Sequence, residues 1–267
     1  FIKLLRNRIK ELNPDALLLG EVWEDASNKC AYGKRRTYFT GGELDSVMNY
    51  PFRTAIVNFV KNLDGGRGFK ETVMSIMENY PSQVAACNMN LLGTHDTPRI
   101  LTALVDDFDG SREEKAKRHL SRNLLPVAVE RLQMASFLQY TLPGSPSLYY
   151  ADEAGMEGYR DPFNRAFFCW DSHEERLRPV LAQLAQLRHS CEAFRTGELR
   201  VLRAEDGILH YQRIGEFEAA EIIVNRTEHI IVETLASGKS TEVNPMGFTI
   251  VVEEVGHNPN HSYYDYV

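Results

Sequence analysis

The sequence predicts an α/β fold that forms half of a (β/α)8 TIM barrel, followed by an all-β antiparallel sandwich domain. Strand-like and helix-like segments alternate over the first 150 residues, which is typical of a parallel sheet with functional loops at the carboxyl ends of its strands. A complete barrel has eight strands in about 250 residues, whereas residues 1–172 hold four convincing strands. After residue 196 the apolar residues follow a period of two, which indicates short antiparallel strands. We therefore expect a half-barrel at 1–196 and a β-sandwich at 197–267.

The elements of the barrel part alternate in type. Residues 1–12 carry apolar side chains at helical spacing and predict an amphipathic helix. The run Leu17-Leu18-Leu19 favours a strand, and Pro51 stands where helices often begin. The predicted strands span 16–22, 44–48, 86–94 and 147–151. The predicted helices span 1–12, 51–63, 68–79 and 115–140.

Turn-forming residues place the connections. An acidic loop is expected at 106–114, and the run PGSP at 143–146 predicts a turn into the last strand of the barrel part. A loop rich in Gly, Asp and Pro follows at 152–172, and leucines at helical spacing predict a helix at 174–194. The predicted strands beyond it span 199–201, 208–211, 219–224, 230–232 and 248–252.

The composition argues against two classes of partner. With 43% hydrophobic and 25% charged residues, the chain has the make-up of an ordinary globular protein. Its net charge of -7 is unsuited to nucleic-acid binding, which needs a basic surface. No apolar run reaches the roughly 18 residues of a membrane span. We therefore expect neither a nucleic-acid nor a membrane partner, and the sequence leaves the localisation open.

Two strand ends carry carboxylates that suit glycoside hydrolysis. Glu21 follows the first predicted strand in the run GEVWE, and Asp96 follows the third in the run GTHDTPR. That reaction needs a carboxylic acid to protonate the leaving oxygen and a carboxylate to stabilise an oxocarbenium-like centre. Glu21 suits the first role and Asp96 the second, with His95 as a hydrogen-bond donor to sugar hydroxyls. Because both motifs end strands of one parallel sheet, we expect them on the same side of it, separated by one strand.

Each motif alone also has a simpler explanation. Glu21 could cap the following turn, and His95 with Asp96 could form a local pair tied to the backbone. Trp23 lies in a loop that should top the barrel and is a candidate for stacking on a sugar ring, although core packing explains many such aromatic residues equally well. The joint arrangement of the two motifs favours a catalytic site.

Four longer stretches stand in the order found in a known enzyme family. They are LLLGEVWEDA at 17–26, ELDSVMNYPFR at 43–53, NLLGTHDTPRIL at 90–101 and PGSPSLYYADEAGMEGYRDPFNR at 143–165. On these stretches the chain resembles the C-terminal part of an alpha-amylase family enzyme (glycoside hydrolase family thirteen), in the neopullulanase and cyclomaltodextrinase branch. The resemblance runs from residue 1 through most of the predicted sandwich. It implies that the barrel part is the second half, strands five to eight.

The resemblance also implies an activity and roles for single residues. It implies retaining hydrolysis or transglycosylation of α-1,4-linked glucans or cyclodextrins, and we expect no cofactor and no metal ion. Glu21 would be the general acid/base and Asp96 would stabilise the transition state, with His95 in contact with sugar hydroxyls. Asp161 and Arg165 match a loop pair that binds a more distant glucose unit in relatives.

One part of the family's site has no counterpart in this sequence. The family's nucleophile is an aspartate in an Arg-x-Asp context at the end of the fourth barrel strand, and the match begins within the helix after that strand. The earlier Asp-x-x-x-Asn-His motif is also without a counterpart, and Ala151 stands where relatives usually carry Gly. We therefore expect that this polypeptide alone does not hydrolyse glucans. We also expect it to associate with the missing barrel half, or with a second copy, across its open strand edges.

Two alternatives stay open. A non-catalytic glycan-binding or interaction module could keep this architecture without its chemistry, but it would be expected to lose the catalytic side chains, and Glu21, His95 and Asp96 are all present. An inverting hydrolase could use Glu21 and Asp96 alone, which requires the two carboxyl groups to lie about 6.5–9.5 Å apart around a water molecule.

Overall fold

The structure, a computed structural model, describes residues 1–170 and 174–255. The end of the loop predicted at 152–172 and the end of the sandwich predicted at 197–267 therefore lie outside the described residues. Within the described ranges, no helix has both the length and the apolar character needed to cross a membrane.

Four short parallel strands of the described chain stand in the order in which they occur in the sequence. They are β1 (Leu19–Gly20), β4 (Ser46–Val47), β5 (Met89–Leu91) and β6 (Ser145–Ser147). β1 pairs with β4, and β5 pairs with β6. A parallel bridge between Met48 and Met89 joins the two pairs. Each strand overlaps one of the four predicted ranges, so the predicted alternation of parallel strands and helices is confirmed.

Helices follow the strands as the sequence predicts, although their bounds differ from the predicted ranges. The helices of this part are α1 (Ile2–Leu12), α2 (Tyr50–Val60), α3 (Arg67–Asn79), α4 (Ser82–Ala86), α5 (Ile100–Ala103), α6 (Arg112–Lys117) and α7 (Leu124–Thr141). The side chain of Asn49 caps α2 by accepting the backbone N–H of Phe52, and Pro51 lies in the first turn. The predicted strand at 86–94 begins later, because Ala86 is the last residue of α4.

The single helix predicted at 115–140 is wrong. α6 ends before Arg118, whose backbone is extended. The Arg118 guanidinium contacts an Asp106 oxygen at 2.9 Å and the Tyr159 hydroxyl at 2.9 Å. These distant partners outweigh the local helical preference of the segment, and a second helix, α7, begins at Leu124.

The predicted turn at 143–146 is also wrong in part, because β6 begins at Ser145. Ser145 pairs in register with Met89, and Pro146 pairs with Asn90. Among the described residues β6 has β5 as its only strand partner. A proline is tolerated at such an edge, because its missing N–H breaks no ladder hydrogen bond on the open side.

The last part of the described chain is antiparallel. The helix predicted at 174–194 is divided at Cys191 into α8 (Leu177–Ser190) and α9 (Glu192–Thr196). The strands are β7 (Glu198–Glu205), β8 (Ile208–Ile214), β9 (Glu218–Asn225), β10 (Ile231–Thr234), β11 (Ser240–Val243) and β12 (Gly247–Glu254). Four of them form a sheet in the order β12-β9-β8-β7, and β10 pairs with β11. β11 was not predicted, because its residues Ser-Thr-Glu-Val lack a clear apolar alternation.

The sheet packs against the barrel helices on one face. Phe137 of α7 stacks on Phe248 of β12 with ring centroids 4.1 Å apart. One continuous buried core holds residues from both regions, among them Val129 of α7 and Ile222 of β9. Because this core crosses residues 196 and 197, the division into a domain at 1–196 and a domain at 197–267 stays a prediction.

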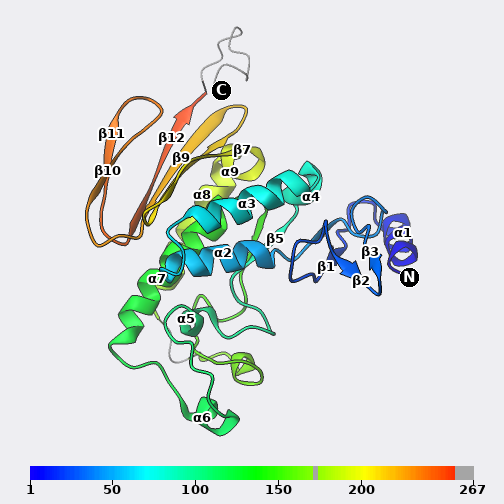
Figure 1. Cartoon of the computed structure of the whole chain (residues 1–267), viewed down its shortest axis with the longest axis horizontal. Coiled ribbons are helices and arrows are strands. Elements are labelled where there is room, and N and C mark those ends of the chain that lie inside the picture. The colour runs from blue at the N-terminus through cyan, green and yellow to red at the C-terminus, as the bar shows by residue number, and fades with distance from the viewer. Residues whose placement is uncertain (171–173, 256–267) are drawn as a thin grey trace.

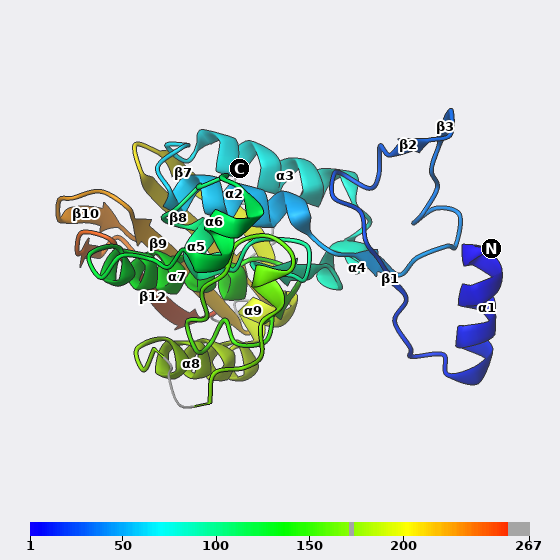
Figure 2. The ribbon, with the colours of Figure 1, turned by 90° about the horizontal axis from the view of Figure 1, so that it is seen from below.

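The N-terminal segment lies at the opposite end of the molecule from the antiparallel sheet. Both views place α1 and the hairpin of β2 (Cys30–Ala31) and β3 (Lys34–Arg35) away from the remaining helices (Figures 1 and 2). None of the residues of α1 is buried. Asp45 holds this segment, because it accepts from Arg6 at 2.8 Å and from the backbone N–H of Leu18 at 2.8 Å.

Candidate active site

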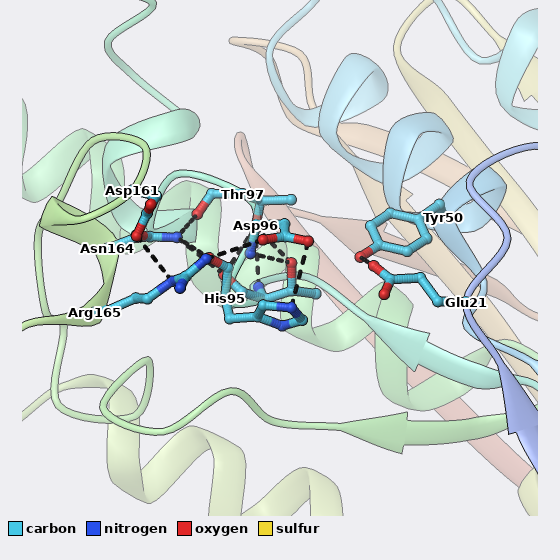
Figure 3. A network of polar contacts seen from close by, with 9 residues as sticks. Glu21, Tyr50, His95, Asp96, Thr97, Asp161, Asn164 and Arg165 are labelled. Carbon is cyan, nitrogen blue, oxygen red and sulfur yellow. Dashed lines mark hydrogen bonds and ion pairs between the residues drawn. The ribbon is translucent and has the colours of Figure 1, made fainter.

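The two predicted motifs meet at the carboxyl ends of β1 and β5. Glu21 directly follows β1, and His95 and Asp96 lie in the loop after β5. One carboxylate oxygen of Glu21, one ring nitrogen of His95 and one carboxylate oxygen of Asp96 all lie within 4.8 Å of one another. Figure 3 shows the Glu21 and Asp96 carboxylates on either side of the same space. As the sequence predicts, one strand, β4, stands between β1 and β5.

Tyr50 orients Glu21. Its hydroxyl donates to Glu21 Oε1 at 2.9 Å, and its ring stacks on Trp23 with centroids 4.0 Å apart and planes 14° apart. Burial, together with the neighbouring Glu21 charge, raises the pKa of Tyr50 to about 12. Tyr50 therefore stays a neutral donor at physiological pH. Its hydroxyl contacts only the Oε1 atom of the Glu21 carboxylate.

Asp96 is held on both of its oxygens. His95 Nε2 lies 3.3 Å from Oδ2, and an Arg165 guanidinium nitrogen lies 3.1 Å from Oδ1. Arg165 also contacts Asp161 at 3.1 Å. The pair predicted to bind a more distant sugar is therefore brought next to Asp96. All four side chains stay between 42% and 57% exposed, which leaves them open to a ligand.

The spacing of Glu21, His95 and Asp96 also suits a metal ion, and it is the only such group found in the described part of the chain. However, Arg165 and His95 already contact the two Asp96 oxygens. A guanidinium at this position opposes a further positive charge. The arrangement therefore favours a polar ligand that exchanges hydrogen bonds, and sugar hydroxyls have this chemistry.

A buried ion pair lies beneath the loop that carries Asp96. Arg99 is fully buried, and it lies 3.4 Å from Asp152, which follows β6. The Arg99 guanidinium is placed over the rings of Tyr149 and Tyr150 at 4.5 and 4.3 Å. Gly93 leaves room for the Asp152 carboxylate, because a Cβ at this position would lie 2.4 Å from an Asp152 oxygen. The pair thus joins the loops after β5 and β6.

Burial of the Asp152 carboxyl makes the stability of the protein depend on pH. Burial raises the pKa of Asp152 to about 7, with Arg99 and Arg53 opposing the shift and Glu153 adding to it. The pKa of Asp152 in the folded protein lies above the unfolded value of about 3.9. The stabilisation from the protonated Asp152 carboxyl is therefore complete below about pH 3.9. It is lost as the pH rises through about 7.

We expect Asp152→Asn to flatten the pH dependence of stability. In the native protein the free energy of unfolding should fall by up to about 1.4 kcal/mol per pH unit from this one group as the pH rises toward 7. Urea unfolding of both proteins between pH 5 and 8 measures the difference. Parallel curves for the two proteins would show that Asp152 does not titrate in this window.

Sequence reasoning missed four residues that shape the site. All of them lie within the quoted stretches but contact partners far away in the chain. They are Tyr50, Arg99, Asp152 and Asn164. The signal for Tyr50 was its place at the start of a helix directly after a barrel strand. No local signal pointed to the other three.

The sequence matches a known family and several known proteins. Residues 1–197 match the family model described as the alpha amylase catalytic domain. An amylopullulanase of Thermoanaerobacter thermohydrosulfuricus is 34% identical over 220 residues, which cover 78% of this chain and 14% of that protein. A cyclomaltodextrinase of Geobacillus thermopakistaniensis (strain MAS1) is 33% identical over 232 residues, which cover 85% of this chain and 34% of that protein.

The fold is shared with solved structures. The ligand-free cyclic alpha-maltosyl-(1-->6)-maltose hydrolase from Arthrobacter globiformis superposes with a TM-score of 0.79 over 95% of this chain and 52% of that chain, at 23% identity. The chain therefore spans about half of this structure and about a third or less of the two curated relatives.

Proposed function

Because the chain belongs to the alpha-amylase family, we propose that it supplies two of the three carboxylates of a retaining glycoside hydrolase site. Glu21 is the general acid/base and Asp96 stabilises the transition state. The observation that carries this proposal is the convergence of Glu21, His95 and Asp96 within 4.8 Å at the ends of two parallel strands. Family membership confirms the resemblance predicted from the four ordered stretches and the α/β barrel fold class.

The substrates we propose are α-1,4-linked glucans or cyclodextrins. The names of the relatives, amylopullulanase and cyclomaltodextrinase, support this class. Trp23 offers a half-exposed indole face and borders a hollow of about 390 Å³ that is also lined by Thr54 and Asn58. An aromatic face beside hydroxyl and amide groups suits a sugar ring. His95 and Arg165, which both contact Asp96, supply hydrogen-bond donors.

The reaction assigns a separate task to each carboxylate. Glu21 gives a proton to the glycosidic oxygen as the bond to the anomeric carbon breaks, and a nucleophilic carboxylate bonds to that carbon. Asp96 stabilises the positive charge that develops on the sugar ring. In the second step Glu21 takes a proton from water, the oxygen of which replaces the nucleophile. The motif that bears this nucleophile has no counterpart among residues 1–267.

Product stereochemistry tests the retaining mechanism. We define the completed enzyme as this polypeptide joined to the part of the Geobacillus cyclomaltodextrinase catalytic domain that lies before the matched stretch. Proton NMR of cyclodextrin hydrolysis by the completed enzyme should show the α-anomer first. First release of the β-anomer would support the inverting alternative.

We further propose that residues 1–196 are strands five to eight of the barrel and that 197–267 form an antiparallel sandwich. The strand order β1-β4-β5-β6 supports the first part. The second part is supported by β10 and β11, because Leu235 and Val243 pack on Ile223 of the four-stranded sheet.

In the described part of the chain β1 pairs with β4 alone, and its open edge suits association with a complementary barrel half. Leu17, two residues before β1, is 58% exposed, and Leu4 and Leu12 of α1, which precedes β1 in the chain, are 74% and 72% exposed. Apolar surface of this kind is stabilised when a partner covers it. We expect the polypeptide to bind the preceding half of the relative's catalytic domain in analytical ultracentrifugation.

A matched pair of variants makes this test specific. Leu12→Lys should weaken the association, whereas Leu63→Lys, at a site that is 67% exposed in the turn after α2, should leave it unchanged. A polypeptide that stays monomeric at every concentration and ignores the complementary half would contradict the association.

A further inference from the structure

Asn164 donates to the backbone of the loop that carries Asp96. It lies in the short 3-10 helix η1 (Phe163–Arg165) and is fully buried. Its amide nitrogen lies 2.6 Å from the carbonyl oxygen of His95 and 2.8 Å from that of Thr97. Figure 3 shows this side chain on the far side of the loop from Glu21. The amide thus contacts the carbonyls on both sides of Asp96.

The amide leaves its own oxygen unsatisfied. Asn164 Oδ1 is buried without a hydrogen-bond partner among the described residues. A buried unpaired acceptor is destabilising. The opposite orientation of the amide would place this oxygen against two carbonyl oxygens. The contribution of this side chain therefore comes from its N–H donors, and they bond only to carbonyls of the loop at 94–97.

The neighbouring residue extends the same hold to the carboxylate. Arg165 Nε donates to the His95 carbonyl at 2.9 Å, and another guanidinium nitrogen donates to Asp96 Oδ1 at 3.1 Å. The His95 carbonyl therefore receives hydrogen bonds from two consecutive residues of η1. On the other side of the loop, the backbone N–H of Arg99 donates to the carbonyl of Gly158 at 2.9 Å. The Asp96 loop is thus fixed from the segment after β6.

We propose that Asn164 is a positioning residue, which fixes the His95–Thr97 backbone and thereby the direction of the Asp96 carboxylate. The importance of that direction rests on the proposed function. The contact itself does not, because it can be measured in the polypeptide without any turnover. Asn164 acts through the loop and touches no reacting atom.

Amide hydrogen exchange tests the positioning role in the 267-residue polypeptide. Asn164→Asp replaces the donating nitrogen by an oxygen of the same shape, and Asn164→Leu removes both polar atoms at similar volume. Asn225→Asp is the matched control. Asn225 is also fully buried, and its amide nitrogen donates to the carbonyls of His229, Val243 and Asn244 at 2.7, 3.0 and 2.9 Å.

Each outcome decides the proposal. We expect the amides of Asp96 and Thr97 to exchange about tenfold or more faster in both Asn164 variants, since a lost hydrogen bond is worth about that factor. The amides of β9 should keep their rates in these variants, and Asn225→Asp should leave the Asp96 loop unchanged. Unchanged loop exchange in Asn164→Leu would overturn the proposal. Global unfolding of both Asn164 variants beside a folded Asn225→Asp would overturn it too, because Asn164 would then be a structural anchor.

The exchange result and the proposed function can fail separately. If the loop amides exchange faster in the Asn164 variants but the completed enzyme is inactive, the positioning role of Asn164 is supported and the proposed function is not. If the completed enzyme is active but loop exchange is unchanged in Asn164→Leu, the proposed function is supported and the positioning role is overturned.

Discussion

A polypeptide of residues 1–267 is expected to release no sugar from maltooligosaccharides or cyclodextrins above background. A retaining reaction needs a nucleophile to form the covalent intermediate, and the motif that bears it has no counterpart in this sequence. Removing the nucleophile from a covalent hydrolase costs about 10⁶-fold in turnover. The completed enzyme should therefore exceed the polypeptide by about this factor in a reducing-sugar assay.

Glu21→Gln serves as the control for contaminating amylase. Turnover by the purified polypeptide that survives this substitution comes from another enzyme. Turnover that disappears with Glu21→Gln would belong to the polypeptide itself. That result would contradict the assignment of the nucleophile to a site outside these residues.

The second large effect is expected from Glu21 in the completed enzyme. General acid catalysis contributes about 10²–10⁴-fold, and Glu21→Gln should lower kcat on maltooligosaccharides by such a factor. With maltosyl fluoride, Glu21→Gln should lower the rate of the first step much less, because fluoride leaves without needing a proton. Asp96→Asn should instead lower the rate with both substrates by about 10²–10³-fold, since charge develops on the sugar ring whichever group leaves.

The comparison of the two substrates separates the two roles. The initial burst of fluoride release, followed with an ion-selective electrode, measures the first step. Equal losses on both substrates for Glu21→Gln would exclude it as the proton donor. If Asp96→Asn lowers the rate on maltooligosaccharides but not on maltosyl fluoride, Asp96, and not Glu21, protonates the leaving oxygen.

The convergence of Glu21 and Asp96 could be predicted because it follows from a rule of parallel sheets. Each residue comes directly after an apolar strand, and the carboxyl ends of parallel strands lie at one edge. The pattern thus fixes the relative position of residues that are far apart in the chain. For the same reason the order of β1, β4, β5 and β6 was predictable.

The supporting contacts could not be predicted because they depend on which distant side chains meet. Tyr50 reaches Glu21 across 29 positions, and Asn164 reaches Thr97 across 67. Arg99 pairs with Asp152 across 53 positions, and nothing in the local pattern of either residue reveals its partner. The break between α6 and α7 has the same origin, since Arg118 leaves the helix for Asp106 and Tyr159.

The most direct test of the account is to locate the covalent intermediate. A fluorinated maltosyl fluoride that forms the intermediate quickly and loses it slowly should label the completed enzyme, and peptide mass spectrometry then locates the sugar. We predict one label, on an aspartate of the added half, and none on peptides from residues 1–267. A label on Glu21, Asp96 or any other carboxylate of these residues would contradict the claim that the chain supplies the acid and the stabiliser but not the nucleophile.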